Sequence, residues 1–219
     1  PDLALANFSS STVSVLLNTT TTVGAISFAR KVEFSTGMLS RPYGVALGDL
    51  DGDGKLDLVT ANAQASTISI FRNTSNPGSL TLKPRVDINA GTTPSRVAVG
   101  DIDGDGKFDL VVTNLLGMNV SIFRNTSAVD TISFGGMVNF LVGTEPWSVD
   151  IGDLDGDSKL DLLVANSAVA GIGSNSLSLL RNTGSGGMIS FATKIDLAVG
   201  TAPYGSAIGD LDGDGKPDL

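Results

Sequence analysis

Short apolar runs recur along the chain at a nearly constant spacing. Around the first acidic loop, four such runs cover Tyr43–Leu50, Leu56–Ala61, Ser66–Phe71 and Leu80–Ile88. The first two runs are almost continuously apolar, as strands buried on both faces are. The third alternates apolar and polar residues, as a half-exposed strand does, and no segment shows a sustained helical period. Four short strands per repeated unit predict an all-β fold, a β-propeller built from four four-stranded blades.

An acidic segment of nine residues marks the period of the repeat. It begins at Asp49, Asp101, Asp153 and Asp210, so the spacings are 52, 52 and 57 residues. Two landmarks keep the same phase, a proline seven residues before each acidic segment and an asparagine in an Arg-Asn-Thr or Leu-Asn-Thr turn. They are Pro42, Pro94, Pro146 and Pro203, and Asn18, Asn73, Asn125 and Asn182. The last unit carries a five-residue insertion at 168–175. We therefore expect a single domain of four repeats, with units close to 1–57, 58–109, 110–161 and 162–219.

The two ends of the chain stand at the same point of the repeat. Pro1-Asp2-Leu3 opens a second strand, and Pro217-Asp218-Leu219 follows a first strand and its acidic loop. The first strand near the C-terminus could therefore complete the three strands at the N-terminus and cover two sheet edges. Three arrangements stay open: a closed four-bladed ring, half of a two-chain eight-bladed ring, and a fragment of a longer propeller. The two-chain ring predicts a homodimer formed by strand exchange at the termini.

Each acidic segment has the pattern Asp-x-Asp-x-Asp-Gly-x-x-Asp, which predicts a Ca²⁺ site between the first and second strands of a blade. Carboxylates at positions 1, 3, 5 and 9 and the carbonyl at position 7 are hard oxygen ligands at a spacing suited to this ion. Glycine at position 6 allows the sharp turn. The predicted ligands of up to four Ca²⁺ ions, with each lysine acting through its carbonyl, are Asp49, Asp51, Asp53, Lys55 and Asp57; Asp101, Asp103, Asp105, Lys107 and Asp109; Asp153, Asp155, Asp157, Lys159 and Asp161; and Asp210, Asp212, Asp214, Lys216 and Asp218.

Three other interpretations of the acidic segments fit less well. An EF-hand needs Glu at position 12 and flanking helices, but the chain has Thr60, Val112 and Val164 there. Metal-free turns need one or two acids, whereas four carboxylates in nine residues repel one another. A catalytic ion needs an open coordination position, and four equivalent copies favour a structural role. The third loop has Ser158 at position 6 and the fourth lies near the C-terminus, so we expect these two sites to be the weaker ones.

Composition narrows the chemistry further. The chain of 219 residues has no histidine and no cysteine, which excludes Ser-His-Asp and Cys-His catalysis, zinc thiolate sites and disulfides. The net charge is −9, and 21 of the 23 acidic residues are Asp, sixteen of them in the acidic segments. No basic stripe indicates a nucleic-acid partner, and no apolar run is long enough for membrane insertion. The first residues show no signal-peptide pattern, so we expect any secretion signal to lie outside this chain.

The units resemble the FG-GAP repeat, also called the VCBS or integrin-alpha-type repeat. The resemblance lies in the aromatic-Gly pairs Tyr43-Gly44 and Tyr204-Gly205 and in a hydrophobic-Gly-Asp entry to every acidic segment. The two middle units have Ser95-Arg96 and Trp147-Ser148 in place of the aromatic-Gly pair. The resemblance implies a calcium-binding β-propeller, often seven-bladed, in an extracellular or cell-surface protein. It also implies a role in adhesion or ligand binding, in some relatives as a lectin or as a non-catalytic module of an enzyme.

The end of the propeller opposite the acidic loops is the predicted ligand face. Its candidate binding residues are Tyr43, Arg96, Trp147 and Tyr204. The three aromatic residues each follow a repeated proline, and their rings could stack on the faces of sugars or act as wedges between blades. The sequons at Asn18, Asn73 and Asn125 are explained by the repeat, as polar turn residues in one phase.

These features predict a calcium-stabilised extracellular binding or adhesion module whose ligand is a carbohydrate or a protein. The alternatives are a structural spacer of a large surface protein and a non-catalytic part of a polysaccharide-active enzyme. We expect no catalytic activity, because the basic residues are scattered along the chain and form no cluster with other reactive groups.

Overall fold

A computed structural model describes residues 1–168 and 175–219, so the predicted insertion at 168–175 lies mostly outside the described residues. Fifteen strands form in the described ranges, and no helix there is long and apolar enough to cross a membrane. The strands are β1 (Leu3–Asn7), β2 (Thr12–Leu16), β3 (Val32–Ser35), β4 (Pro42–Gly48), β5 (Asp57–Asn62), β6 (Thr67–Phe71), β7 (Val86–Asn89), β8 (Pro94–Gly100), β9 (Asp109–Asn114), β10 (Asn119–Asn125), β11 (Phe134–Leu141), β12 (Pro146–Gly152), β13 (Asp161–Asn166), β14 (Ser176–Leu180) and β15 (Ile195–Ala198).

The strands form four antiparallel sheets, each made of strands consecutive in the sequence. β4–β7, β8–β11 and β12–β15 are sheets of four strands, and β1–β3 form a sheet of three. The all-β prediction is confirmed. The N-terminal sheet has no first strand in the described chain, as the phase of the repeat predicts, because Leu3 pairs with β2 in the same way as Leu58 pairs with β6.

The fourth strand of the second sheet is shorter than predicted. We expected a strand over Leu80–Ile88, but β7 covers only Val86–Asn89. Pro84 has no N–H to donate to the sheet, and the residues before it form isolated bridges such as that between Asn73 and Leu82. β11 has no proline at the corresponding point and extends over eight residues.

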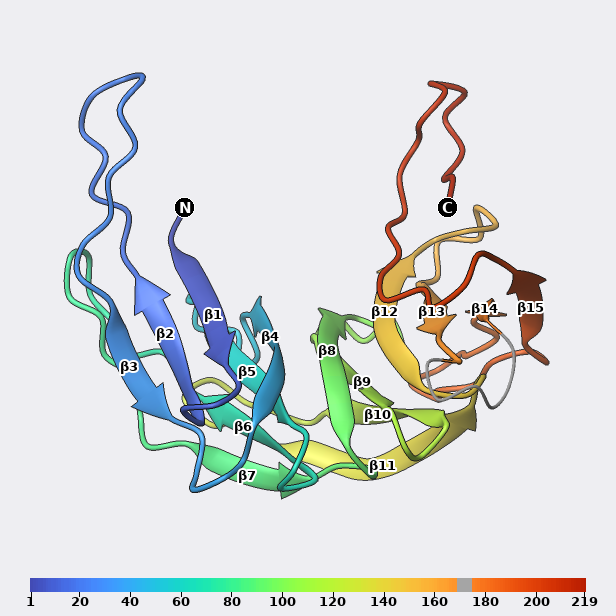
Figure 1. The fold of residues 1–219 in the computed structure, drawn as a ribbon, viewed down its shortest axis with the longest axis horizontal. Helices are drawn as coiled ribbons and strands as arrows, with labels where there is room; N and C mark the ends of the chain where they lie inside the picture. The colour runs from blue at the N-terminus through green and yellow to red at the C-terminus, as the bar shows by residue number, and fades with distance from the viewer. Residues whose placement is uncertain (169–174) are drawn as a thin grey trace.

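The sheets follow one another along an open arc (Figure 1). β1, β4, β8 and β12 lie on its concave side, and β3, β7, β11 and β15 lie on the outer rim. β4 contacts β8 and β8 contacts β12, which is the arrangement of inner strands in a β-propeller-like fold. The two ends of the arc lie apart, and in the described chain Gly209 and Asp218 form only a single bridge with each other. The closed four-bladed ring is therefore not formed in this structure, and strand exchange with a second chain stays a prediction.

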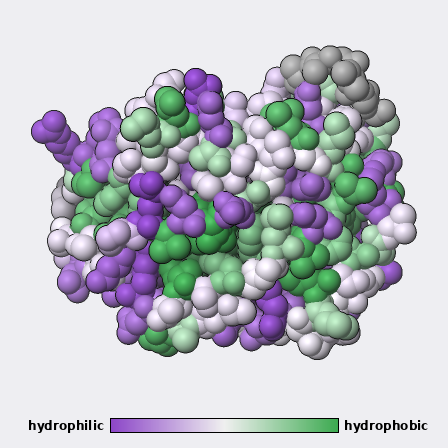
Figure 2. Space-filling model, turned by 90° about the horizontal axis from the view of Figure 1, so that it is seen from below, coloured by the Kyte–Doolittle hydropathy of each residue, from purple (hydrophilic) through white to green (hydrophobic). Residues whose placement is uncertain are grey.

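Apolar cores lie between neighbouring sheets. The three second strands β5, β9 and β13 are buried along their whole length, as their continuous apolar sequence predicts. Leu50, Val97 and Leu110 belong to the core between the second and third sheets, and Ile102, Val149 and Leu162 belong to the next. Figure 2 shows the outer rim from below, where hydrophobic side chains appear in patches between hydrophilic ones. Burial between sheets, rather than within one sheet, holds the arc together.

A polar ladder crosses each sheet at the end away from the acidic loops, with its serine buried and its outermost side chain exposed. Asn62 Nδ2 donates to Ser69 Oγ at 2.7 Å, and Ser69 Oγ donates to Asp87 Oδ1 at 2.6 Å. The other sheets repeat this order with Asn7, Ser14 and Glu33, with Asn114, Ser121 and Asn139, and with Asn166, Ser178 and Asp196. Because a shift of one residue would turn every member of the ladder to the other face, the ladder fixes the strand register.

Glycine lets the chain pass close to the ladder asparagines. A Cβ atom on Gly91 would lie 2.4 Å from Asn114 Cγ, and one on Gly143 would lie 2.7 Å from Asn166 Cβ. Gly143 N also donates to Asn166 Oδ1 at 3.0 Å. Before Pro94 and Pro146, the glycine three residues earlier is therefore required by contact with the second strand of the sheet that follows.

We predict that Gly143→Ala lowers the free energy of unfolding by roughly 1–3 kcal/mol, because the added methyl group overlaps Asn166. Urea unfolding would measure the loss. Gly136→Ala is the matched control, since a Cβ atom there meets nothing within 4 Å, and it should leave stability nearly unchanged. Equal losses in the two variants would contradict the role of this contact.

Candidate metal centres

The acidic loops join the first and second strands of the sheets. Three of them connect β4 to β5, β8 to β9 and β12 to β13, and the fourth follows Gly209 near the C-terminus. Asp57, Asp109 and Asp161 at position 9 are the first residues of buried strands. The sheet therefore fixes position 9, and in three of the four loops the chain brings positions 1 and 3 close to it.

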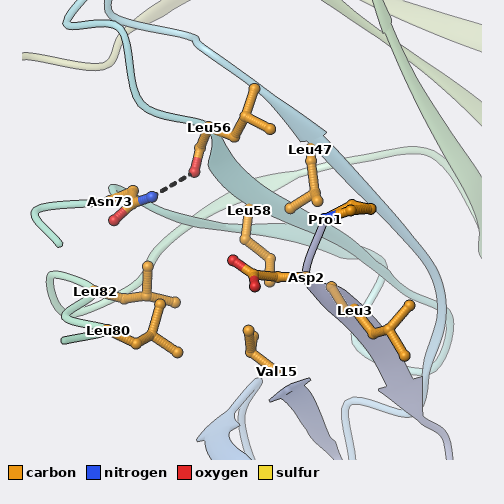
Figure 3. Close-up of a pocket in the computed structure, with 11 residues that line it drawn as sticks. Pro1, Asp2, Leu3, Val15, Leu47, Leu56, Leu58, Asn73, Leu80 and Leu82 are labelled. Carbon is orange, nitrogen blue, oxygen red and sulfur yellow. Dashed lines mark hydrogen bonds between the residues drawn. The ribbon is translucent and has the colours of Figure 1, made fainter. Parts of the chain in front are cut away.

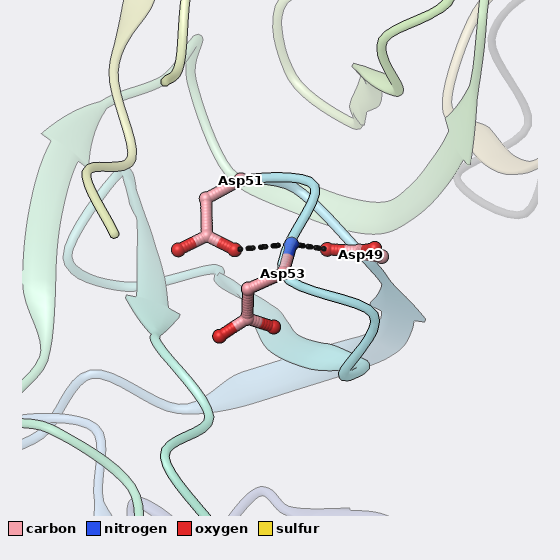
Figure 4. Close-up of side chains that lie close together, drawn as sticks. All are labelled: Asp49, Asp51 and Asp53. Carbon is pink, nitrogen blue, oxygen red and sulfur yellow. Dashed lines mark hydrogen bonds between the residues drawn. The ribbon is translucent and has the colours of Figure 1, made fainter. Parts of the chain in front are cut away.

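In the first loop, Asp49, Asp51 and Asp53 come together (Figure 4). The backbone amide of Asp53 donates to Asp49 Oδ1 at 3.1 Å and to Asp51 Oδ1 at 3.3 Å, and Asp49 Oδ2 accepts from Gly54 N at 2.9 Å. One carboxylate oxygen of each of the three lies within 4.8 Å of the others. Ligands on opposite sides of one Ca²⁺ are about 5 Å apart, so this spacing and these hard donors fit the ion.

The other three loops bring together a different part of the predicted ligand set. Their groups combine positions 1, 3 and 9: Asp101, Asp103 and Asp109; Asp153, Asp155 and Asp161; and Asp210, Asp212 and Asp218. Position 9 of the first loop and position 5 of the others, namely Asp57, Asp105, Asp157 and Asp214, lie outside these groups. Every position-5 carboxylate, including Asp53 inside the first group, accepts the amide of the lysine two residues later, at 2.8 to 3.0 Å. The carbonyls of Lys55, Lys107, Lys159 and Lys216 stay predicted ligands.

In the acidic loops of the second and third sheets, the carboxylate at position 9 is the most buried one. Asp57 Oδ2 accepts from Leu50 N at 3.0 Å and Oδ1 accepts from Asn73 N at 2.8 Å. Asp109 makes the same two kinds of contact. Burial raises the pKa of Asp57, and it raises the pKa of Asp109 to about 6. A cation in the loop would favour the ionised form of both carboxyl groups. A hard divalent ion would therefore compensate for the cost of burying their negative charge.

Arginine side chains lie over the first two loops, a feature that we did not predict. Arg72 pairs with Asp51 and with Asp53, the latter at 3.0 Å between Nη2 and Oδ2. Arg124 pairs with Asp103 in the same way, and Arg181 reaches the third loop at 3.8 Å. These arginines recur one residue before the phased asparagine, and this recurrence is the sequence signal that could have revealed them. They offset part of the repulsion among the carboxylates.

Two of the phased asparagines join the first and second loops to the next sheet. Asn125 Nδ2 donates to the carbonyl of Leu50 at 2.9 Å and to that of Phe108 at 2.8 Å. Asn182 makes the equivalent bond to Ile102 at 2.8 Å. Their side-chain oxygens accept an amide two residues later, as Asn125 Oδ1 does from Ser127 N at 2.8 Å. Their interpretation as turn residues, rather than glycosylation sites, is supported by these contacts.

The sixth loop position has a left-handed backbone in every loop. Its φ is +84° at Gly54, +86° at Gly106 and +83° at Gly215, and it is +68° at Ser158. A side chain in this region is strained. The third loop therefore has the backbone strain that we expected from Ser158.

Family models match most of the chain. The FG-GAP-like repeat model matches residues 1–60, 49–112 and 167–219, and the FG-GAP repeat model matches residues 146–178. The chain belongs to the FG-GAP-like repeat family. No curated protein matches the chain. Repeats of this family are typically non-catalytic structural or binding modules, often extracellular, and they often bind Ca²⁺.

The FG-GAP-like arc also gathers the predicted aromatic residues on its concave side. The ring centroids are 4.8 Å apart for Phe8 and Tyr43, 5.8 Å for Tyr43 and Trp147, and 5.1 Å for Trp147 and Tyr204. Tyr43 and Trp147 can meet because the intervening β8 carries the small, buried Ser95 at this position. We call Phe8, Tyr43, Trp147 and Tyr204 the aromatic cluster. Phe8 was not predicted, since it has no aromatic counterpart in the other units.

Arg96 does not provide the cation of the aromatic cluster. It is exposed beside Gly44, where its Cδ would lie 3.3 Å from an added Cβ atom. The guanidinium that lies over a ring is that of Arg41, 5.4 Å from the centroid of Phe8. The structure thus brings together three of the four predicted ligand-binding residues and places a different arginine over the cluster.

We predict that Ser158→Gly raises the free energy of unfolding by about 1 kcal/mol, because glycine relieves the left-handed strain. Gly106→Ser in the second loop should lower it by a similar amount, since the space around Gly106 is open and only its backbone conformation matters. Urea unfolding of the two variants would measure both changes. Shifts of the same sign would contradict the strain argument.

Proposed function

We propose that the chain is a calcium-stabilised extracellular binding or adhesion module. The observation that carries the proposal is the fourfold recurrence of three carboxylates whose oxygens lie within 4.8 Å of one another. Four loops of one design, each at the entry to a second strand, favour a structural ion over a catalytic one. Membership of a family that often binds Ca²⁺ in extracellular proteins supports the same conclusion.

Calcium in these loops would stabilise the joins between sheets as well as the loops themselves. The second residue of a loop is packed in the core shared with the next sheet, as Leu50 and Ile102 are. Both amides, of Leu50 and Ile102, donate to the position-9 carboxylate of their own loop. An ion that holds the loop would therefore also hold the apolar residue that anchors the next sheet.

We predict that excess chelator lowers the melting temperature. A site with a dissociation constant near ~10 μM contributes roughly 2.7 kcal/mol at about 1 mM Ca²⁺, which corresponds to ~5–10 °C for a chain of this size. Asp101→Asn should reduce the shift caused by chelator. Asp196→Asn, on β15 outside the loops, is the control. It should change the melting temperature by the same amount with and without chelator. A melting curve of the natural chain that is unchanged by chelator would refute calcium stabilisation.

We further propose the aromatic cluster as the ligand site, with carbohydrate as the favoured ligand. Tyr43 and Tyr204 are 40% and 54% exposed on either side of Trp147, so their rings and hydroxyls are accessible together. The Trp147 indole N–H is buried and has no hydrogen-bond partner among the described residues. Aromatic faces with polar edges suit the apolar faces and hydroxyl rims of sugars. A protein ligand and a purely structural role of these rings are the alternatives.

Trp147 is the only tryptophan of the chain, so its fluorescence reports on the aromatic cluster directly. We predict that titration with a panel of neutral oligosaccharides changes its emission, and that Tyr204→Ala weakens binding by ~2- to 10-fold. Val129→Ala, an exposed position near the acidic loops, should leave the affinity unchanged. If no member of the panel changes the emission, the role as a structural spacer is favoured.

A further inference from the structure

Arg72 and Arg124 share their partner carboxylates with the ions predicted for the first and second acidic loops. In the first loop the clustered carboxylates are Asp49, Asp51 and Asp53, and Arg72 holds two of them. Its Nε atom donates to Asp51 Oδ2, and its Nη2 atom donates to Asp53 Oδ2 at 3.0 Å. A guanidinium and Ca²⁺ both bind carboxylate oxygens, and two positive charges repel each other. The arginine and the ion therefore oppose each other at this loop.

The second loop repeats this geometry. Arg124 Nε donates to Asp103 Oδ2, and Nη2 donates to Asp105 Oδ2 at 2.9 Å. Asp103 belongs to the group of three carboxylates in this loop, and Asp105 is a predicted ligand. The side chains of Asp51 and Asp103 are 0% exposed. Water and salt therefore screen their contacts with the arginines only weakly.

The phased asparagine places each arginine beside its loop. Asn73 follows Arg72, and its Nδ2 atom donates to the carbonyl of Leu56 at 2.8 Å (Figure 3). Its backbone amide donates to Asp57 Oδ1 at 2.8 Å. Asn125 makes the same two kinds of contact one unit later. Because these bonds hold the turn against the end of the loop, the side chain before the asparagine starts next to the carboxylates.

The third loop has the same anchor but a weaker arginine contact. Asn182 Nδ2 donates to the carbonyl of Leu160 at 3.0 Å, yet Arg181 Nη1 lies 3.8 Å from Asp155 Oδ2. These two side chains are 56% and 37% exposed, and an exposed ion pair contributes little. The third loop is therefore an internal comparison, because it has the arginine without the close contact.

We propose that Arg72 and Arg124 compete with Ca²⁺ for the first and second acidic loops and so raise the Ca²⁺ concentration at which these two sites fill. The inference rests on the proposed calcium function and adds a regulation of two of its sites. Each arginine offsets the repulsion among the carboxylates of its loop, which keeps the loop formed at low Ca²⁺. Binding of the ion weakens the contacts between the guanidinium and the shared carboxylates, and this loss lowers the affinity.

Calorimetric titration with Ca²⁺, after divalent ions are removed by chelator and dialysis, tests the proposal. Arg72→Met and Arg124→Met remove the charge and keep a long side chain. Each should leave the number of bound ions unchanged and tighten one site by ~3- to 10-fold, because a positive charge beside the divalent ion is lost. Arg181→Met is the matched control and should change the affinity by less than about 2-fold, since its ion pair is exposed.

Two further measurements separate competition through contact from a general effect of charge. Arg72→Lys keeps the charge but cannot bridge two carboxylates with a planar fork. Its affinity should therefore lie between those of the natural chain and Arg72→Met. The tighter binding of Arg124→Met should persist at high salt, because Asp103 is buried. A gain in affinity that disappears at high salt would overturn competition through direct contact.

Melting curves distinguish competition from a purely structural role of the arginines. With excess chelator, Arg124→Met should melt below the natural chain, because the carboxylates of its loop lose their counter-charge. In saturating Ca²⁺ this difference should shrink. Arg124 is 40% exposed, so the variant should still fold. Equal losses in the two conditions, or a Ca²⁺ affinity that is unchanged or weaker in both methionine variants, would contradict the proposal.

The same titrations separate this proposal from the proposed function. If the natural chain binds no Ca²⁺ but the methionine variants do, the calcium-stabilised function fails and the competition stands. If the natural chain binds Ca²⁺ and both variants bind it equally well, the function stands and the competition fails. An absence of binding in all of these chains would overturn both.

Discussion

The arc depends on one recurring contact, the insertion of an acidic loop into the side of the next sheet. The loop presents an apolar residue to the shared core, and an asparagine of the next sheet binds the carbonyl of that same residue. A buried carbonyl without a partner would cost stability, so the apolar contact and the hydrogen bond have to form together. This coupling explains why the acidic segment, the asparagine and the spacing between them recur as one unit.

Much of the fold follows from the sequence because the repeat is so regular. The second strands are fully buried as their continuous apolar runs predict, and the acidic loops lie between first and second strands. The prediction of the fourth strand was wrong in length, because Pro84 interrupts a segment whose apolar pattern continues. The openness of the arc could not be predicted, since matched ends fit a closed ring, a paired ring and a fragment equally well.

The candidate sites were predictable to different degrees. Spacing alone predicted that carboxylates cluster in each loop, whereas it did not predict that position 5 belongs to the group of the first loop and position 9 to the groups of the other three. The pairing of Arg72 and Arg124 with these loops required knowledge of which turn lies beside which loop. In the aromatic cluster, Tyr43 reaches Trp147 only because a small residue, Ser95, stands between them, and Phe8 comes from outside the repeated pattern.

The buried phased asparagine has a consequence for how the protein can be made. Asn125 begins an Asn-Thr-Ser sequon, yet it is only 1% exposed, and its Nδ2 atom donates to two backbone carbonyls. N-linked glycosylation attaches its sugar to that same nitrogen. In a secretory pathway, folding and glycan transfer would therefore compete for one atom. A chain modified there before its sheets join could not bring the second and third sheets together, so the yield of folded protein would depend on which process is faster.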